Sequence, residues 1–554
     1  MVRQAVRANT QKRQINLARS IPAPVGGWDA QSPLAGMPPQ NAVILDNWIP
    51  RSGYCEVRRG FIPQQTGTAA PVKSMMAYRG GASGDTLFAS AGGNLYDVTV
   101  QGAALGAPVY SGFSNNIWNA THFANAAGQW LIAMNGTDTP IGYNAGTWAT
   151  LPAITGSSGS ITLTSTNLLA CAPHQGRLLC IEKNTLHVWF PAAGAVGGAM
   201  QLLDLGSIFS KGGRLIAVET WSWQFGVTAD QYAVFMTDQG QIALYSGIDP
   251  SDANSWTLTG VYDFGKPIGQ KALVKYGSDL VIIATDGIIP LSQAMNLDRA
   301  ADNTVALTSK IAPAFAAAVR AYKGNTGWQG ILYPGDTTSN DANADAGSLA
   351  IFNIPTASFS TSVQFVQNMS TGAWCRLMGI NAFCWEIAND AIYFGSTSGV
   401  YQWDVGASDN GVTITANMLP AFSNFGSAAT KQFTMVRPLL NTSGIVAPAI
   451  DINTDFSLTM PSATPSVVDR GAVQSEIRYD WTSTSGMGYF GSVAMQVSIQ
   501  SDPNAQNVAT DSTMANILAV NGSGDVLITE PALPFDVPCQ LISFDVQYQN
   551  GGQL

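Results

Sequence analysis

The sequence predicts an all-β protein: an irregular β-propeller-like platform with a short helical insertion, followed by a C-terminal antiparallel β domain. Three observations predict this class. The 554 residues include 56 Gly and 28 Pro, and only 11% are charged, a composition typical of many short strands joined by turns. Pairs of short apolar strands recur about every 40–50 residues, which is the spacing of propeller blades. From about residue 430 onward, apolar and polar residues alternate strictly.

The first sixty residues divide into two segments. Residues 1–24 predict a basic, extended arm, because residues 1–19 hold five Lys or Arg and no acid. We expect this arm to become ordered on an acidic partner surface. Residues 25–62 are rich in Gly, Pro and Trp and are expected to close or dock the platform. Within them, Ala42–Trp48 and Cys55–Phe61 predict a hairpin around Pro50–Gly53.

The platform is predicted over residues 63–430 from a recurring pair of strands. Each pair is an apolar run, a turn with Gly, Asn or Asp, and a second apolar run. A helical insertion is expected at about residues 293–325, where Ile311, Phe315 and Val319 have helical spacing. A weaker hairpin, from Trp328–Tyr333 and Leu349–Ile354, brings the number of hairpins to about seven. The other six are Thr86–Thr99, Gln129–Tyr143, Gly176–Phe190, Tyr232–Tyr245, Leu280–Leu291 and Ala391–Trp403.

Residues 431–554 predict a separate antiparallel domain whose strands have one buried and one solvated face. The alternation runs through Ile450–Leu458, Val493–Gln500 and Ile542–Tyr548. Residues 451–554 carry eleven Asp or Glu against two Arg, so we expect the acids on the outward face of this domain.

Charge and cysteine usage argue against several classes of protein. The net charge is −10, so a basic surface that grips nucleic acid is not expected beyond the N-terminal arm. No apolar run approaches the roughly 18–20 residues of a membrane-spanning helix. Six cysteines in a chain of this length do not make a disulfide framework, so we expect free thiols and folding in a reducing cytoplasm.

Enzyme and metal motifs are present only in incomplete form. Gly260–Lys266 has the spacing of a phosphate loop, but Pro267 replaces the hydroxyl residue that would bind magnesium. One stretch resembles a calcium loop without its bidentate acid, and contains Asp341, Asn343 and Asp345. One Cys/His cluster fits core packing better than zinc, and consists of Cys171, His174, Cys180 and His187. We therefore predict no catalytic residue, no cofactor and no metal.

Ile21–Phe61 carries a more specific pattern. It contains Gly-Gly-Trp after a proline, then Leu-Asp-Asn-Trp-x-Pro, and ends in Arg-x-Gly-Phe. This stretch resembles the N-terminal signature of the tail nozzle family of short-tailed bacteriophages, also called tail tubular protein B. The similarity extends over about residues 20–440. Its other phrases are Gly265–Leu291, Asn368–Arg376, Ile392–Asp404 and Asp409–Thr413.

The resemblance implies a structural virion protein rather than an enzyme. Tail nozzles are similar in forming a hexameric ring below the head–tail adaptor, which encloses the DNA exit channel used for genome ejection. The implied partners are further copies of the chain, the adaptor, tail fibre or spike proteins, and double-stranded DNA that passes without specific binding. We expect a virion protein made in the host cytoplasm, without stable membrane insertion. A chain with few charges can bury wide subunit interfaces, and an acidic bore would not retain DNA.

Two sets of residues are candidate sites. The signature supplies the interface candidates Trp28, Pro33, Met37, Asn47, Trp48, Arg58 and Arg59. The outward acids of the C-terminal domain supply the channel-lining candidates Asp451, Asp455 and Asp545.

Two alternatives stay open: a tail spike or adhesin propeller that binds cell-surface glycans, and a propeller hydrolase acting on polysaccharide. The glycan alternative would use exposed aromatic side chains, although tryptophans in propeller strands more often fill the space between blades. The tryptophans concerned are Trp221, Trp223, Trp374, Trp385 and Trp403.

Overall fold

Strands dominate the computed structural model. It describes residues 16–82, 84–102, 104–225, 228–295, 305–335, 348–442, 446–468, 476–478, 480–501, 519–520, 526–527 and 539–550. The chain divides into two units: residues 58–414 form one, and residues 1–57 together with 415–554 form the other. We call them the ring unit and the terminal unit. This division differs from the predicted linear order, because the terminal unit combines both ends of the chain.

The ring unit begins with four sheets that follow one another along the chain. In each, neighbouring strands are mostly antiparallel, and short Gly, Asn or Asp turns join them. The first contains β7 (Ser74–Tyr78), β8 (Thr86–Ala91), β9 (Asn94–Asp97) and β10 (Tyr110–Ser111). The second contains β11 (Asn119–Asn125), β12 (Gly128–Met134), β13 (Ile141–Asn144) and β14 (Thr147–Thr150). The third contains β15 (Thr155–Ser158), β16 (Ile161–Thr162), β17 (Leu168–His174), β18 (Arg177–Glu182), β19 (His187–Pro191) and β20 (Ala199–Asp204), with the 3-10 turn η1 (Ser165–Asn167) before β17. The fourth contains β21 (Leu215–Phe225), β22 (Thr228–Thr237), β23 (Gln241–Gly247) and β24 (Trp256–Asp263).

Three further sheets and the helical insertion complete the ring unit. The fifth sheet contains β25 (Leu273–Tyr276), β26 (Asp279–Ala284) and β27 (Gly287–Pro290). The helices α1 (Leu291–Ala294), η3 (Leu307–Ile311) and α2 (Ala312–Tyr322) follow it. The sixth sheet contains β28 (Gln329–Tyr333), β29 (Leu349–Ala357), β30 (Thr361–Asn368) and β31 (Trp374–Leu377). The seventh contains β32 (Cys384–Ala388), β33 (Ala391–Gly395) and β34 (Gly399–Trp403), and its fourth strand is β6 (Phe61–Thr66) from the start of the unit. The short strand β35 (Ser408–Asp409) pairs with the beginning of β6.

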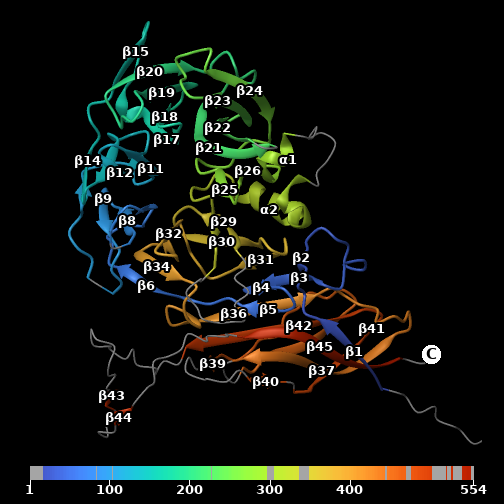
Figure 1. Ribbon diagram of the computed structural model, residues 1–554. Helices are drawn as coiled ribbons and strands as arrows, with labels where there is room; N and C mark the ends of the chain where they lie inside the picture. The colour runs from blue at the N-terminus through green and yellow to red at the C-terminus, as the bar shows by residue number, and fades with distance from the viewer. Residues whose placement is uncertain are drawn as a thin grey trace, which may run out of the picture. The chain divides into compact units, whose positions relative to one another are not determined.

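Strands of neighbouring sheets lie side by side around a closed ring. The neighbours are β7 with β12, β11 with β17, β17 with β21, β21 with β25, β25 with β28, β28 with β32, and β32 with β7. Figure 1 shows the labelled sheets of this unit following one another around a common centre. The last contact in the series joins the seventh sheet to the first, so the described part of this unit is a seven-sheet ring.

Apolar side chains fill the space between adjacent sheets of the ring. One cluster joins the first two sheets through Phe88, Trp118 and Trp148. Further clusters join the second sheet to the third, the third to the fourth and the fourth to the fifth. The cluster that contains Val72 and Cys384 joins the seventh sheet to the first. These interfaces bury the aromatic residues that the sequence places near strand ends, and they stabilise the ring through the hydrophobic effect.

The terminal unit is built from two mostly antiparallel sheets. In the first, β45 (Gln540–Asn550) pairs on one side with β37 (Lys431–Thr442) and on the other with β1 (Asn16–Pro22) and β5 (Cys55–Val57). β4 (Trp48–Pro50), β40 (Glu476–Arg478) and β41 (Thr482–Gly488) complete it. The second contains β2 (Gly27–Trp28), β3 (Asn41–Asp46), β38 (Ala449–Thr454), β39 (Ser466–Val468), β42 (Gly491–Ser501) and residues 415–420 of β36 (Val412–Pro420). A separate two-stranded pair contains β43 (Ala519–Val520) and β44 (Val526–Leu527).

The predicted fold class is confirmed: the molecule is an all-β protein with an irregular propeller-like unit, a short helical insertion and an antiparallel β domain. Each of the seven predicted hairpins is present. In α2 and η3, the side chains of Ile311, Phe315 and Val319 are buried as their helical spacing predicts. A hairpin around Pro50–Gly53 forms as predicted, but it is shorter: β4 pairs with β5, while Ala42–Asp46 of β3 pairs with β36 instead. However, the strand that closes the ring is β6, which follows that hairpin.

Candidate functional site: the clasp that closes the ring

The Arg-x-Gly-Phe end of the signature and the Asp-Asn-Gly phrase come together in the ring unit. The Arg58 guanidinium is buried and binds the Asp409 carboxylate through two parallel hydrogen bonds, Nη1 to Oδ1 at 2.7 Å and Nη2 to Oδ2 at 2.6 Å. Arg58 Nη2 also donates to the Met378 carbonyl at 2.8 Å. A buried, bidentate arginine–carboxylate pair of this kind fixes the geometry of the segments that carry it. We call Arg58, Gly60, Phe61 and Asp409 the clasp.

Gly60 allows two chain segments to approach closely within the clasp. A Cβ atom at this position would lie 1.9 Å from the Ser408 carbonyl oxygen, so only glycine fits. The Gly60 amide donates to the Gly406 carbonyl at 2.7 Å, and the Val405 amide donates to the Gly60 carbonyl at 3.2 Å. Residues 405–409 are thereby fastened to the start of the ring unit.

Phe61 places the closing strand on the seventh sheet. It begins β6, which pairs antiparallel with β34 from Gly399↔Thr66 to Trp403↔Phe61. Its ring packs edge-on against Phe394 and Tyr401, with centroids 5.0 Å and 5.4 Å apart. A strand from the start of the unit therefore completes the last sheet, and the chain closes its own ring without a partner.

The earlier part of the signature stabilises its own loop in the terminal unit. Asp29 Oδ1 accepts the backbone N–H groups of Gln31 and Ser32 at 3.0 and 2.8 Å, and Oδ2 accepts the Asn41 amide at 2.6 Å. Burial raises the pKa of Asp29, but these hydrogen bonds outweigh it and lower the pKa below its ordinary value. Gly26 is required beside them, because a Cβ would lie 2.2 Å from Asn41 Oδ1.

Most of the predicted interface residues are buried inside the chain, which corrects that prediction. Trp28, Met37, Asn47, Trp48 and Arg58 all lie in the interior. Asn47 adopts φ 61°, a left-handed conformation that Asn tolerates, and its amide donates to the Thr415 carbonyl at 2.8 Å. Buried side chains cannot contact a second molecule without unfolding their surroundings. Of the seven candidates, Pro33 is exposed and Arg59 is half-buried, and for these two the interface role stays a prediction.

The three acids predicted to line the channel have different environments. Asp545 is half-buried and accepts from Arg437 Nε at 3.1 Å, so its charge is neutralised locally. Asp455 Oδ1 accepts the backbone N–H groups of Tyr489 and Phe490 at 2.9 and 3.1 Å, which makes it a turn residue. Asp451 is exposed on β38, and its carboxylate accepts only the neighbouring Ile452 N–H among the described residues. Of the three candidates, Asp451 is therefore the one whose charge faces solvent and whose carboxylate holds no other segment of the described chain in place.

The Cys/His cluster does not assemble into a metal site in the described residues. Cys171 and Cys180 are buried register partners on β17 and β18, and the hydrogen bond with Cys171 together with burial raises the pKa of Cys180 well above its ordinary value. His174 Nε2 lies 2.9 Å from the Gly247 carbonyl, and His187 Nδ1 lies 3.1 Å from Glu182 Oε2. No group of three His, Cys, Asp or Glu side chains gathers anywhere in the described ranges. The calcium-like stretch at Asp341, Asn343 and Asp345 lies outside those ranges.

Four of the five tryptophans of the predicted aromatic platform are not exposed, and the side chain of the fifth, Trp223, lies outside the described part of the structure. Trp221, Trp374, Trp385 and Trp403 are all buried, with at most 2% of their surface exposed. Trp385 and Trp403 pack edge-on with centroids 6.0 Å apart inside the ring unit. These side chains stabilise the ring and do not offer a stacking face to a sugar.

In two sheets, a turn aspartate binds the link that leads into the sheet, and the sequence analysis did not predict these contacts. Asp138 accepts the backbone N–H groups of Ser114 and Asn115, both at 2.9 Å, in the link that leads into β11. Asp238 accepts the Arg214 N–H at 3.1 Å in the link that leads into β21. In both cases the acceptor lies 24 residues after the first donor, and this spacing is a signal that the sequence does contain.

Comparisons with known proteins give no family for this chain. No family model matches it, and no curated protein matches it. Two solved structures titled as BBS1N in complex with ARL6DN are similar at 11% and 8% identity, with TM-scores of 0.25 and 0.38. They cover 39% and 65% of this chain, and 62% and 99% of their own length. The extracellular domain of a putative one component system from B. thetaiotaomicron is similar at 11% identity and TM-score 0.37, and covers 68% of this chain and 43% of its own. Likenesses this weak carry no argument about function. None of the described helices is long and apolar enough to cross a bilayer.

Proposed function

We propose that this protein is a structural, non-enzymatic component of a phage tail: a tail nozzle whose copies form a ring below the head–tail adaptor and enclose the DNA exit channel. The clasp is the observation that carries the proposal. Two phrases that resemble the nozzle family, Arg-x-Gly-Phe at residues 58–61 and Asp-Asn-Gly at 409–411, lie about 350 residues apart in the chain and meet in one buried ion pair. Where two of the resembling phrases meet, their residues hold the architecture together, and this supports a shared architecture rather than a shared active site.

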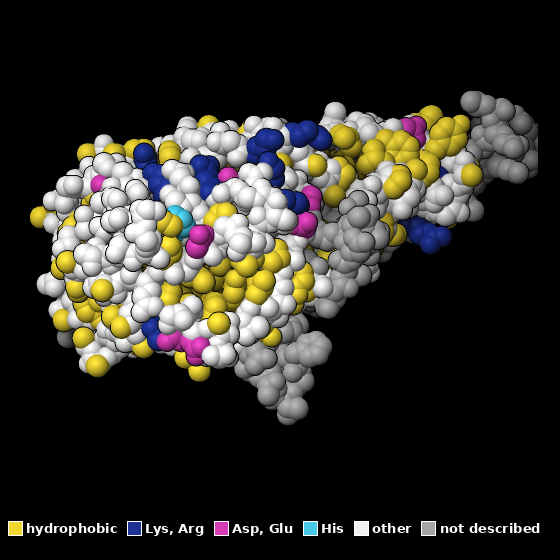
Figure 2. Space-filling model, turned by 90° about the horizontal axis from the view of Figure 1, so that it is seen from above, with side chains coloured by type: hydrophobic (Ala, Val, Ile, Leu, Met, Phe, Trp, Pro, Cys, Tyr) yellow, Lys and Arg dark blue, Asp and Glu magenta, His cyan; other side chains and the backbone are white. Residues whose placement is uncertain are grey.

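The sparse charge of the surface also supports this proposal. Figure 2 shows a face on which uncharged polar groups and backbone predominate, while Lys and Arg side chains gather along one margin. Surfaces of this kind bury wide subunit interfaces without removing many ions from water. In the assembled tail, we propose a hexameric ring in contact with the adaptor on one side and with fibre or spike proteins outside, with double-stranded DNA passing through without specific binding.

Reconstitution with a portal–adaptor complex from the phage that encodes this chain tests the proposal. The purified chain is expected to co-sediment with the complex and to appear by electron microscopy as a ring at its distal end. Failure to associate, together with binding of the free chain on a glycan array, would instead support the adhesin alternative. Release of sugars from a polysaccharide would support the hydrolase alternative.

A further inference from the structure

A cavity of about 280 Å³ lies at one end of the ring unit, where the first strands of its sheets begin. Its walls come from the segments directly before β7, β11, β25, β28 and β32. Segments that lead into five of the seven sheets therefore contribute to one partly open space. Ligand sites of proteins are commonly concave spaces of this kind, formed where several elements converge.

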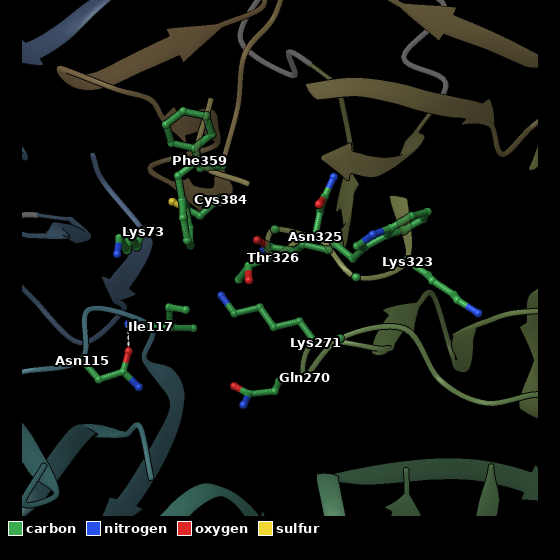
Figure 3. Close-up of a pocket in the computed structure, with 16 residues that line it drawn as sticks. Lys73, Asn115, Ile117, Gln270, Lys271, Lys323, Asn325, Thr326, Phe359 and Cys384 are labelled. Carbon is green, nitrogen blue, oxygen red and sulfur yellow. Dashed lines mark hydrogen bonds between the residues drawn. The ribbon is translucent and has the colours of Figure 1, made fainter. Parts of the chain in front are cut away.

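The charged side chains that line this cavity are all lysines: Lys73, Lys271 and Lys323. The full sequence contains only ten lysines, so three around one small space is an unusual concentration. Figure 3 shows Lys271 extended into the middle of the cavity toward Thr326, with Lys73 on the opposite side, whereas the ammonium group of Lys323 points away. Among the described residues none of the three is in an ion pair. Lys73 Nζ lies 4.7 Å above the Phe359 ring, which holds it at the cavity wall.

A nearby carboxylate does not neutralise Lys271. Glu386 is half-buried on β32, and its Oε1 lies 3.5 Å from Arg79 Nη2. Burial raises the pKa of Glu386, and the charges of Arg79 and Lys271 partly oppose that rise. Glu386 is not among the cavity-lining residues, so the space that Lys271 enters contains no anion from the described part of the chain.

The rest of the lining combines neutral polar groups with apolar walls. Trp328 and Phe383 lie in the apolar wall but are largely buried, and the Trp328 indole is fixed by a 3.0 Å hydrogen bond to the Tyr322 carbonyl. Gln270 offers an amide that forms no hydrogen bond within the described residues. Cys384 is the one thiol among the lining residues that the structure describes, and burial raises the pKa of this thiol to about 12, so it stays protonated at neutral pH. This chemistry suits binding and not covalent catalysis.

We propose that the cavity binds a small organic anion, with a carboxylate or phosphate group held between Lys271 and Lys73 and a small apolar body in the remaining space. The inference does not depend on the proposed tail function, since it concerns a site within a single ring unit. The lysine ammonium groups supply charge-assisted hydrogen bonds, and the shielded site strengthens them relative to the open surface.

Calorimetric titration of the full-length protein with matched probes tests the proposal. Benzoate and phenyl phosphate supply the two anionic groups on the same ring, and benzamide is their neutral counterpart. We expect at least one anion to bind and benzamide not to bind. Lys271→Gln should weaken anion binding about tenfold or more, as loss of a charged hydrogen bond predicts. Lys323→Gln is the matched control, because it removes the same charge from the same cavity rim while its ammonium points outward.

Each outcome bears on the proposal. Equal binding of benzamide, equal effects of the two lysine substitutions, or absence of binding by both anions would overturn it. Lys73→Gln provides a second variant in case Lys271→Gln alters folding, which thermal unfolding of each variant will reveal. Stronger binding of phenyl phosphate than of benzoate would assign the phosphate group, and the reverse order would assign the carboxylate.

Discussion

At the residue scale, the buried Arg58–Asp409 pair should be more costly to break than an exposed ion pair, because its loss leaves a buried charge without a partner. Arg58→Ala would leave the Asp409 carboxylate without its partner in a site where the Arg58 side chain has no exposed surface. We expect the free energy of unfolding to fall by about 3–5 kcal/mol, as for other broken buried pairs. Urea unfolding followed by tryptophan fluorescence measures the change.

The matched control is Arg214→Ala. Arg214 lies 3.3 Å from Asp238 but is about half exposed, so its loss should change the unfolding free energy by less than about 1 kcal/mol. The double variant Arg58→Met with Asp409→Leu should recover most of the stability, because no buried charge is left alone. Equal effects of Arg58→Ala and Arg214→Ala would show that the clasp is not a stabilising element.

The carboxyl group of Asp138 should make the unfolding free energy of the protein depend on pH. Burial raises its pKa, but hydrogen bonds from Ser114, Asn115 and Asn135 outweigh burial and lower the pKa below the ordinary 3.8. A carboxyl group with a depressed folded-state pKa stabilises the fold above its unfolded pKa, and this contribution disappears as the pH falls through the folded value. The unfolding free energy of the native protein should therefore exceed that of Asp138→Asn at about pH 7, and the difference should shrink toward about pH 3.

Chemical unfolding at several pH values measures this difference. Asp252→Asn is the control, because Asp252 is exposed and, among the described residues, its carboxylate accepts only the backbone and side-chain N–H groups of Asn254 in its own loop. It should change the unfolding free energy little at any pH. A difference for Asp138→Asn that is constant with pH would contradict the assignment.

At the scale of elements, β6 closes the ring only if Gly60 lets the chain pass Ser408. Gly60→Ala would place a Cβ 1.9 Å from a backbone oxygen, so the strand and residues 405–409 must separate. We expect a loss of about 1–3 kcal/mol and faster hydrogen exchange of the β6 amides. Gly106→Ala is the control, since a Cβ at that position would have no described atom within 4 Å and the stability should change by less than about 0.5 kcal/mol. Unaltered exchange in β6 after Gly60→Ala would contradict its role in closure.

Local sequence patterns predict the elements of this fold well, and long-range pairing poorly. The hairpins were predictable because a turn such as Asp238–Gly240 and its flanking apolar runs are adjacent in the chain. The pairing of both chain ends in one sheet was not predictable, because neither local sequence pattern indicates that Ile21 pairs with Phe544. For the same reason, the signature suggested exposed contacts, whereas Trp48 and Arg58 are interior residues.

The candidate site was accessible to sequence reasoning only in part. The phrases that resemble the nozzle family include the segments that form the clasp. They did not indicate that Arg58 and Asp409, 351 residues apart in the chain, bind each other. The lysine-lined cavity was not predictable from the sequence, since Lys73 and Lys271 lie 198 residues apart, in the segments before β7 and β25, and no local pattern links them.

At the scale of the whole molecule, the proposed channel requires a negative lining that does not retain DNA. Asp451 is the candidate to test, because Asp545 is paired with Arg437 and Asp455 holds a turn. If Asp451 lines the bore, Asp451→Lys would place a cation beside the passing phosphates and slow genome ejection from purified virions. Dye fluorescence on released DNA measures the rate. Asp252→Lys applies the same change of charge in an exposed loop of the ring unit and should leave the rate unaltered. Identical rates for both variants would remove Asp451 from the channel.

The mass of the assembled particle tests the central proposal most directly. Native mass spectrometry of the purified chain, alone and with its portal–adaptor complex, distinguishes a closed ring from a free subunit. We predict a species of six times 58.3 kDa, alone or bound to the complex. A particle that stays at 58.3 kDa under both conditions would contradict the proposal that this protein works as one segment of a DNA-conducting ring.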